Sequence, residues 1–416
     1  MKKRKFSIEY RWAIIAASFL MVFVSLGFCS SNKSLYLSAI TETLGIKRSL
    51  FSLNDSCRYI MTAVMNVFFG AAVSKFGTKR MIGFGFASLI ASMLIYAYAS
   101  SIAWFCVGGC FLGIGLAFTT TTMVGSVVNQ WCRDKKGRIM GAVLAANGLG
   151  GALAAQIISP IIYEEGNSFG YRNAYKLVAL ILFVSAAVIL LVFKERGASQ
   201  ANEKSERSLR QRWEGFEYKE TVKKPYFVVT MVCVFMTGLV LQGINGMAAA
   251  HMKDVGLDAA FIAIVLSVHS IALAAFKFLT GLVYDKKGLR FTMTVCDIAA
   301  VLMTFLLANI AATQLGSALA MLYGILSALA LPLETIMLPL LTGRLFGNKS
   351  YDRLLGLVVA VNTAGYAIGN PVVNWCYDSY GTYAPMLYIF CGIMAAVTIT
   401  FQFIVSASAR DRGSIQ

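Results

Sequence analysis

The stretch that decides the fold is residues 277–288, KFLTGLVYDKKG, in which a lysine lies inside an apolar run that ends in a charged turn flanked by glycines. Residues 70–77, GAAVSKFG, repeat the last eight positions of this stretch 211 residues earlier. In both copies the two glycines are seven residues apart and enclose a lysine. Because 211 residues is about half of the 416-residue chain, the echo indicates two similar halves.

A second motif repeats at nearly the same distance. Arg-x-x-Gly, followed by Asn six residues later and by Gly three residues further on, occurs at residues 138–150 and again at 353–365, an offset of 215 residues. Two unrelated motifs that share almost one offset argue against a chance match. Tandem halves of this size are the usual construction of secondary transporters.

The composition indicates a protein that uses lipid as its solvent. Hydrophobic residues make up 58% of the chain and charged residues 14%, and the mean hydropathy is +0.68. This leaves too little polar surface for a soluble protein of this length. Apolar runs long enough to cross a hydrocarbon core of about 30 Å occur at residues 12–38, 52–73, 80–100, 103–130, 139–162, 173–193, 225–250, 259–284, 291–312, 315–342, 353–376 and 384–406.

These runs predict an all-α membrane protein of twelve transmembrane helices in two pseudo-symmetric six-helix bundles. We expect the N-terminal bundle to cover residues 1–193 and the C-terminal bundle to cover residues 225–416. Residues 194–224 are charged and lack an apolar period, so they are interpreted as a solvated cytoplasmic linker.

The net charge of +17 is explained by membrane topology rather than by nucleic acid. If both termini and every second connection between spans are cytoplasmic, those segments hold 29 of the 37 Lys and Arg residues, which is the positive-inside bias. The basic N-terminus leads into a run too long for a signal-peptide core, so we expect a retained first helix. The predicted location is the cytoplasmic (inner) membrane, multi-pass, with both termini cytoplasmic.

Six ionisable residues remain for the membrane interior, where such groups are costly and mark function unless they are paired. They are Lys33, Arg58, Lys277, Asp55, Asp297 and Glu334. Each cation also has a structural explanation as an alternative. Arg58 lies three residues after Asp55, on the same helix face, and Lys277 has Asp297 or Glu334 as candidate partners. Lys33 lies near a helix end, from which a lysine can reach the headgroups.

No pattern in the sequence indicates catalysis, a cofactor or a metal site. There is no phosphate-binding glycine loop, no nucleophile elbow and only two histidines. The nine cysteines lack metal-ligand spacing and lie mostly inside apolar runs, where thiols pack as small apolar groups. We therefore expect a protein that is not an enzyme and that binds no cofactor and no metal.

The two glycine turns resemble the signature Gly-x-x-x-Asp-(Arg/Lys)-x-Gly-x-(Arg/Lys) of the major facilitator superfamily, which follows the second and the eighth spans. Gly281, Asp285 and Gly288 match this signature in the second copy, whereas the first copy has Ser74 in place of the aspartate. The resemblance implies the major facilitator fold, transport by alternating access, and a gating role for the three matching residues.

Within that superfamily the chain is similar to the branch of monocarboxylate transporters and the bacterial oxalate:formate antiporter. Lys277, four residues before Gly281, occupies the place of the branch's substrate-binding arginine, and Lys33 is similar to a lysine of its first helix. The antiporter's second cation, on helix eleven, falls at Asn362. The resemblance also places helices seven and ten at a central cavity. It thereby implies a substrate site formed by Lys277, Lys33, Gln242, Asn245 and Asn362.

The resemblance predicts a secondary transporter of a small organic anion, with a monocarboxylate as the expected substrate, coupled to a proton or a counter-anion. Glu334, Asp297 and Arg58 are the candidate coupling or gating residues, and we expect the chain to work as a monomer in the lipid bilayer. The alternative is a proton-coupled exporter of hydrophobic or cationic compounds, in which Glu334 or Asp297 holds the charge of the substrate. Three interior cations against three acids do not discriminate between the two.

The predicted topology is testable by thiol labelling. A cysteine placed at Gln200 in an otherwise thiol-free variant is expected to resist membrane-impermeant reagents in intact cells, because the linker is cytoplasmic. Rapid labelling of that cysteine would contradict the assignment.

Overall fold

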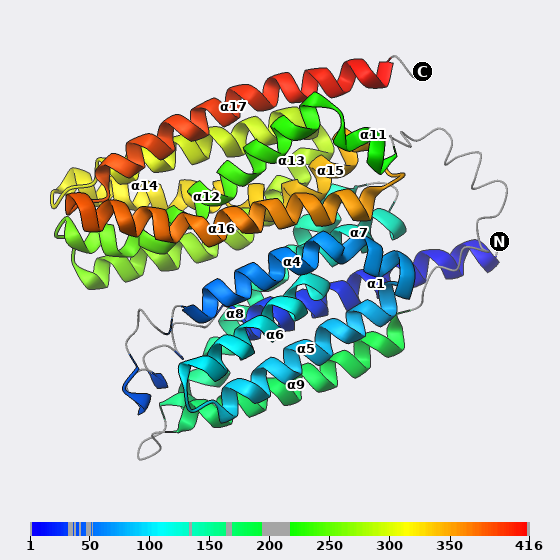
Figure 1. The fold of residues 1–416 in the computed structure, drawn as a ribbon, viewed down its shortest axis with the longest axis horizontal. Helices are drawn as coiled ribbons and strands as arrows, with labels where there is room; N and C mark the ends of the chain where they lie inside the picture. The colour runs from blue at the N-terminus through cyan, green and yellow to red at the C-terminus, as the bar shows by residue number, and fades with distance from the viewer. Residues whose placement is uncertain are drawn as a thin grey trace. The chain divides into compact units, whose positions relative to one another are not determined.

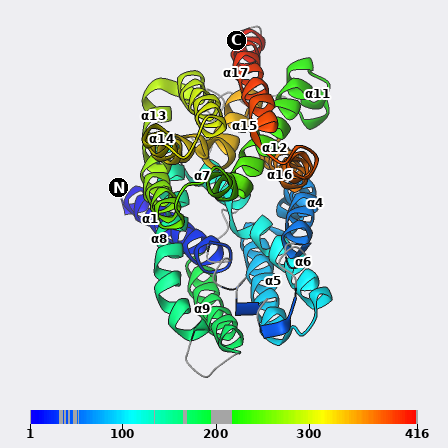
Figure 2. The same cartoon turned by 90° about the vertical axis from the view of Figure 1, so that its left-hand side faces the viewer.

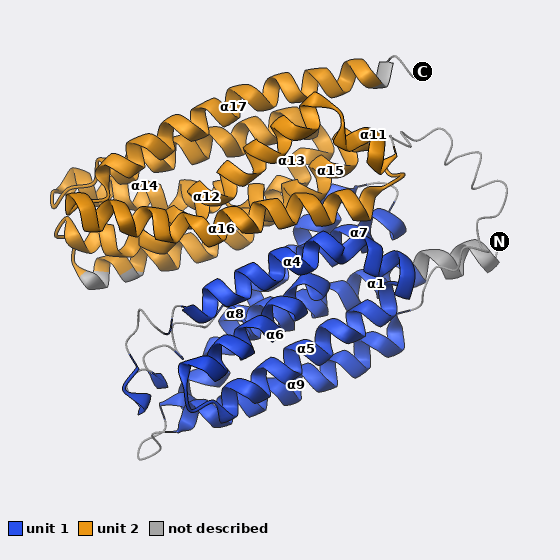
Figure 3. Cartoon of the chain, viewed as in Figure 1, with its two compact units in different colours: residues 1–212 blue, residues 213–416 orange. Residues whose placement is uncertain are grey.

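The computed structural model describes residues 2–31, 36, 39–40, 43–46, 51, 53–132, 135–163, 169–193 and 217–413. The regular structure in these residues is helical, which confirms the predicted all-α class (Figure 1). The chain divides into two compact units, residues 1–212 and 213–416 (Figure 3). The boundary between the units lies in the charged segment between the two repeats.

Unit 1 contributes six candidate membrane spans that run side by side (Figures 1 and 2). In chain order they are α1 (Lys2–Val22) continued by the π-helix η1 (Phe23–Phe28), α4 (Leu53–Phe76), α5 (Thr78–Tyr98), α6 (Ile102–Thr119) continued by α7 (Thr121–Trp131), α8 (Lys136–Ile162) and α9 (Gly170–Val192).

Unit 2 begins with the short α11 (Tyr218–Val222) and contributes five further candidate spans. These are α12 (Pro225–Asp254), α13 (Ala259–Ala308), α14 (Gln314–Ala330) continued by the π-helix η3 (Leu333–Met337) and α15 (Leu338–Phe346), α16 (Tyr351–Tyr380) and α17 (Ala384–Gly413). α13 has 50 residues and is broken at Gly288. Since an unbroken helix of that length would measure about 75 Å, more than twice the hydrocarbon core, α13 contains two spans, as the prediction of twelve requires.

The repeated glycine turns have the same backbone conformation in both units. Gly77 has φ 85° and ψ 156°, and Gly288 has φ 80° and ψ −179°. A residue with a Cβ is strained at such a positive φ, so positions 77 and 288 both require glycine. The structural equivalence of positions 77 and 288 explains why the motif repeats at 211 residues.

A close crossing of the first and fifth spans explains the second repeated motif. In unit 1 a Cβ added at Gly150 of α8 would lie 2.2 Å from the carbonyl oxygen of Phe23, and one added at Gly27 would lie 2.6 Å from the Cα of Gly150. In unit 2 a Cβ at Gly365 of α16 would lie 2.4 Å from the carbonyl oxygen of Phe235. Such distances are far inside van der Waals contact, so the helices approach this closely only with glycine at the crossing.

Two spans are interrupted where the sequence carries threonine or proline. Between α6 and α7, Thr120 leaves the helical conformation, and the hydroxyls of Thr119 and Thr120 donate to helix carbonyls one turn earlier at 2.8 and 2.7 Å. Between α14 and α15, Pro332 lacks an N–H and is followed by the wide turn η3. η3 carries Glu334 and positions it for the site described below.

The glycine crossing generates a matched pair of variants. Gly365→Ala is expected to destabilise the protein by about 1–3 kcal/mol, because the new methyl group must push two backbones apart. Gly392→Ala on α17, where a Cβ meets nothing within 4 Å, is expected to keep or raise stability because alanine favours helix. Thermal unfolding in detergent compares the two, and equal unfolding temperatures would contradict the role given to the crossing.

Candidate functional site

The central group of the candidate site is Lys277, which lies inside an apolar stretch of α13 and is 5% exposed. It is eleven residues from the turn at Gly288, about 16 Å along the helix, and therefore near the middle of a hydrocarbon core of about 30 Å. Within the residues that the structure describes, its ammonium group has no ion pair within 4.0 Å. A buried cation is thus held in the membrane without a direct counter-ion.

The carboxyl of Glu334 is a charged complement with which Lys277 interacts electrostatically. Glu334 is 7% exposed, and it interacts electrostatically with Lys277 and with the side chain of Tyr366 on α16. Its Oε1 has no hydrogen-bond partner in the described part of the chain. Lys277 and Glu334, predicted as alternative partners in an ion pair, form none within 4.0 Å in the described residues, although they interact electrostatically.

His269 lies two helical turns before Lys277 and joins the same group of side chains. Its Nδ1 is 2.7 Å from Ser327 Oγ and 3.2 Å from the carbonyl oxygen of Gly324, both on α14. The imidazole also interacts electrostatically with Lys277. His269 is absent from the residues predicted to form the site; its spacing of eight residues from Lys277 is the one signal that the sequence offers.

Asp297, on the second span of α13, does not pair with Lys277 in the described conformation. It is completely buried, and neither carboxyl oxygen has a hydrogen-bond partner among the described residues. The buried thiols of Cys296 and of Cys233 on α12 interact with Asp297 electrostatically. A carboxylate without partners is costly at this depth, which makes Asp297 a second unusual group in unit 2.

The other residues predicted in unit 2 have different surroundings. Asn362 is 1% exposed, and its Nδ2 donates to the carbonyl oxygen of Val234 at 3.1 Å, so it belongs to the contact between α16 and α12. Gln242 on α12 is half-buried, whereas Asn245, one turn later, is exposed. Asp285 is exposed, about one helical turn beyond the buried Gly281.

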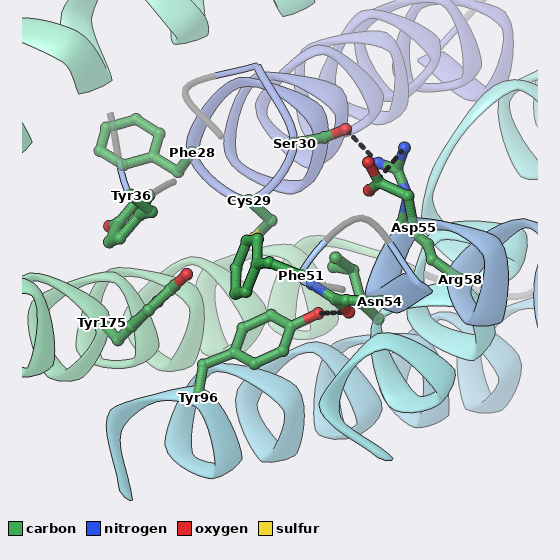
Figure 4. Close-up of a pocket in the computed structure, with 11 residues that line it drawn as sticks. Phe28, Cys29, Ser30, Tyr36, Phe51, Asn54, Asp55, Arg58, Tyr96 and Tyr175 are labelled. Carbon is green, nitrogen blue, oxygen red and sulfur yellow. Dashed lines mark hydrogen bonds and ion pairs between the residues drawn. The ribbon is translucent and has the colours of Figure 1, made fainter. Parts of the chain in front are cut away.

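In unit 1 the candidate residue Arg58 ties the end of the first span to α4. Its Nη1 donates to Ser30 Oγ at 2.7 Å, and its Nη2 lies 3.6 Å from Asp55 Oδ1, so the local ion pair expected from the spacing is formed (Figure 4). The guanidinium also covers the ring of Tyr59 at 4.4 Å. Its buried Nε has no hydrogen-bond partner within the described residues.

Arg58 lines a pocket that the sequence does not predict (Figure 4). The Tyr96 hydroxyl donates to Asn54 Oδ1 at 2.7 Å, and the rings of Tyr36 and Tyr175 stack with centroids 4.1 Å apart. The side chains leave room for little more than a water molecule.

The predicted site residue Lys33 lies outside the described residues.

A polar pair in unit 1 corresponds to Lys277 and Glu334. The Thr122 hydroxyl donates to Asn66 Oδ1 at 2.7 Å, and Asn66 Nδ2 donates to the Thr62 carbonyl at 2.9 Å. Asn66 precedes Lys277 by 211 residues, and Thr122 precedes Glu334 by 212. The corresponding place is therefore neutral and hydrogen-bonded in unit 1 but charged in unit 2.

Known proteins with related sequences include transporters of organic acids. The chain is 22% identical over 264 residues to the sialic acid transporter NanX of Escherichia coli K12, which covers 61% of this chain and 60% of that protein. It is 24% identical over 291 residues to the oxalate:formate antiporter of Oxalobacter formigenes, which covers 68% of this chain and 66% of the antiporter. The chain thus spans about three fifths to two thirds of the length of these relatives.

Solved structures and a family model identify the fold. The proton:xylose symporter XylE superposes with a TM-score of 0.74 at 14% identity, covering 96% of both chains. The fucose:proton symporter FucP of E. coli superposes with a TM-score of 0.71 at 13% identity, covering 95% of this chain and 98% of FucP. The family model of the Major Facilitator Superfamily matches residues 18–247 and 230–414. The predicted fold is confirmed, and the chain belongs to the major facilitator superfamily.

Proposed function

We propose that the chain is a secondary transporter that moves a small organic anion, a monocarboxylate, across the cytoplasmic membrane by alternating access. The observation that carries the proposal is Lys277, a cation buried in the middle of a span with no ion pair within 4.0 Å in the described residues. A lysine at this depth costs about 2.5–3.5 kcal/mol on insertion scales. A bound carboxylate would offset that cost.

The fold itself does not require a cation at position 277. The corresponding residue of unit 1 is Asn66, which is 1% exposed and satisfied by neutral hydrogen bonds. A packing role would be met equally well by such a neutral residue. The lysine therefore has a role other than holding helices together, and anion binding is the role that its charge suits.

The relatives support the same class of substrate. One is named for sialic acid and another for oxalate and formate, and all three compounds carry carboxylates. For this chain we favour a single carboxylate. The second cation of the antiporter falls at the neutral Asn362, whose amide is engaged with the Val234 carbonyl, so a second carboxylate would be desolvated without a partner, at a cost of several kcal/mol.

Substitution of Lys277 tests the proposal. Lys277→Ala is expected to weaken monocarboxylate binding at least about 30-fold, because truncating a buried charge contact costs about 2 kcal/mol or more. Lys277→Arg keeps the charge and is expected to retain binding. Calorimetric titration of purified protein with monocarboxylates, dicarboxylates and lipophilic amines measures both effects.

A stability control separates binding from folding. Without ligand, Lys277→Ala is expected to unfold within a few degrees of the wild type, whereas Arg58→Ala, which loses the Ser30 hydrogen bond and the Asp55 ion pair, is expected to unfold earlier. Wild-type affinity in Lys277→Ala would overturn the proposal. Binding of amines but not of carboxylates would favour the exporter alternative.

We further propose that Glu334 carries the coupling proton. In reconstituted vesicles Glu334→Gln is expected to lose accumulation driven by a pH gradient but to keep substrate exchange, because the amide mimics the protonated acid. Asp297→Asn is the matched control for the other buried carboxyl. Loss of driven uptake in Asp297→Asn alone would transfer the coupling role to Asp297.

A further inference from the structure

The hydrogen bonds of His269 determine which ring nitrogen carries its hydrogen. The Gly324 carbonyl can only accept, and it lies 3.2 Å from Nδ1. The Ser327 hydroxyl donates its own hydrogen to the same carbonyl at 3.0 Å, so its oxygen is left to accept from Nδ1 at 2.7 Å. Both contacts require a hydrogen on Nδ1.

The consequence is that Nε2 of the neutral imidazole presents a lone pair. Among the described residues the hydrogen bonds of His269 are made by Nδ1, and none is made by Nε2. The residue is half-buried, so part of its surface is accessible. The two contacts to α14 fix the ring, and an acceptor held in place binds a partner at a smaller entropic cost than a mobile one.

His269 also lies at a defined distance from the carboxylate anchor. Eight residues of helix separate it from Lys277, which is about 12 Å along the axis. This is the rise between the two backbone positions; the long side chain of Lys277 leans toward the N-terminal end of its helix, which brings its ammonium group nearer to the imidazole. A ligand that reaches both groups would carry its hydroxyl several carbon atoms from its carboxylate.

We propose that His269 is a specificity-determining residue whose Nε2 accepts a hydrogen bond from a substrate hydroxyl, so that the substrate is a hydroxylated monocarboxylate with a hydroxyl several carbons from its carboxylate. This rests on the proposed function, in which Lys277 binds the carboxylate. A site that holds an acceptor ready for a hydroxyl discriminates against the analogue that lacks it, because the acceptor is then left unpaired.

The test compares two acids that differ in one group, 6-hydroxyhexanoate and hexanoate, by calorimetric titration of the purified full-length protein. The wild type is expected to bind the hydroxylated acid about tenfold more tightly. His269→Ala is expected to remove that preference by weakening the binding of the hydroxylated acid about tenfold relative to hexanoate, and His269→Gln is expected to restore part of it through the amide oxygen. His251→Ala is the matched control, because that imidazole is 3% exposed and engaged with the Leu307 carbonyl.

The outcomes separate this inference from the proposed function. Equal wild-type binding of the two acids, with both lost in Lys277→Ala, would overturn the role of His269 and leave the anion site intact. Binding of neither acid to the wild type would contradict the anion site itself. An unchanged preference in His269→Ala, or its loss in His251→Ala, would also overturn the inference.

Discussion

The close approach of two helix backbones in each unit is the constraint on which the rest of the structure depends. Gly27 meets Gly150 in unit 1, and Gly238 lies against Asn362 and Gly365 in unit 2. In a bilayer the lipid is as apolar as the side chains, so burial alone gives helices little reason to associate. Glycine at the crossings instead allows backbone contact. The crossing in unit 2 also fixes the rotation of α16, which carries Tyr366 toward Glu334.

The parts of the fold that could be predicted are those that a local pattern defines. The lengths of the apolar runs predicted the membrane spans. The repeat was recognisable because glycine is needed at positions 77 and 288, where φ is positive and a residue with a Cβ would be strained. Breaks within spans, such as the π-turn around Glu334, were visible only as a proline beside an acid.

The partners of the polar side chains could not be predicted in the same way. In a soluble helix the polar face reveals which side is buried, but in these spans both the interior and the lipid-facing sides are apolar, so the sequence does not define the rotation of each helix. This is why Asn362 was expected at the substrate and is found against Val234. It is also why the sequence did not predict the pocket in which Asn54, Tyr96 and Tyr175 lie near Arg58.

The two units hold different polar pairs at matching positions, a neutral pair in unit 1 and an ionisable pair in unit 2. In unit 1 the Thr122 hydroxyl donates to Asn66, so this neutral pair is hydrogen-bonded. Lys277 and Glu334, at the matching places, interact electrostatically but form no ion pair within 4.0 Å in the described residues, and Oε1 of Glu334 has no hydrogen-bond partner there. The neutral pair of unit 1 is satisfied by hydrogen bonds, whereas the ionisable pair of unit 2 carries the energetic cost of burying charge in the membrane. The two halves thus share a repeated backbone but differ in the charge that they bury at matching positions.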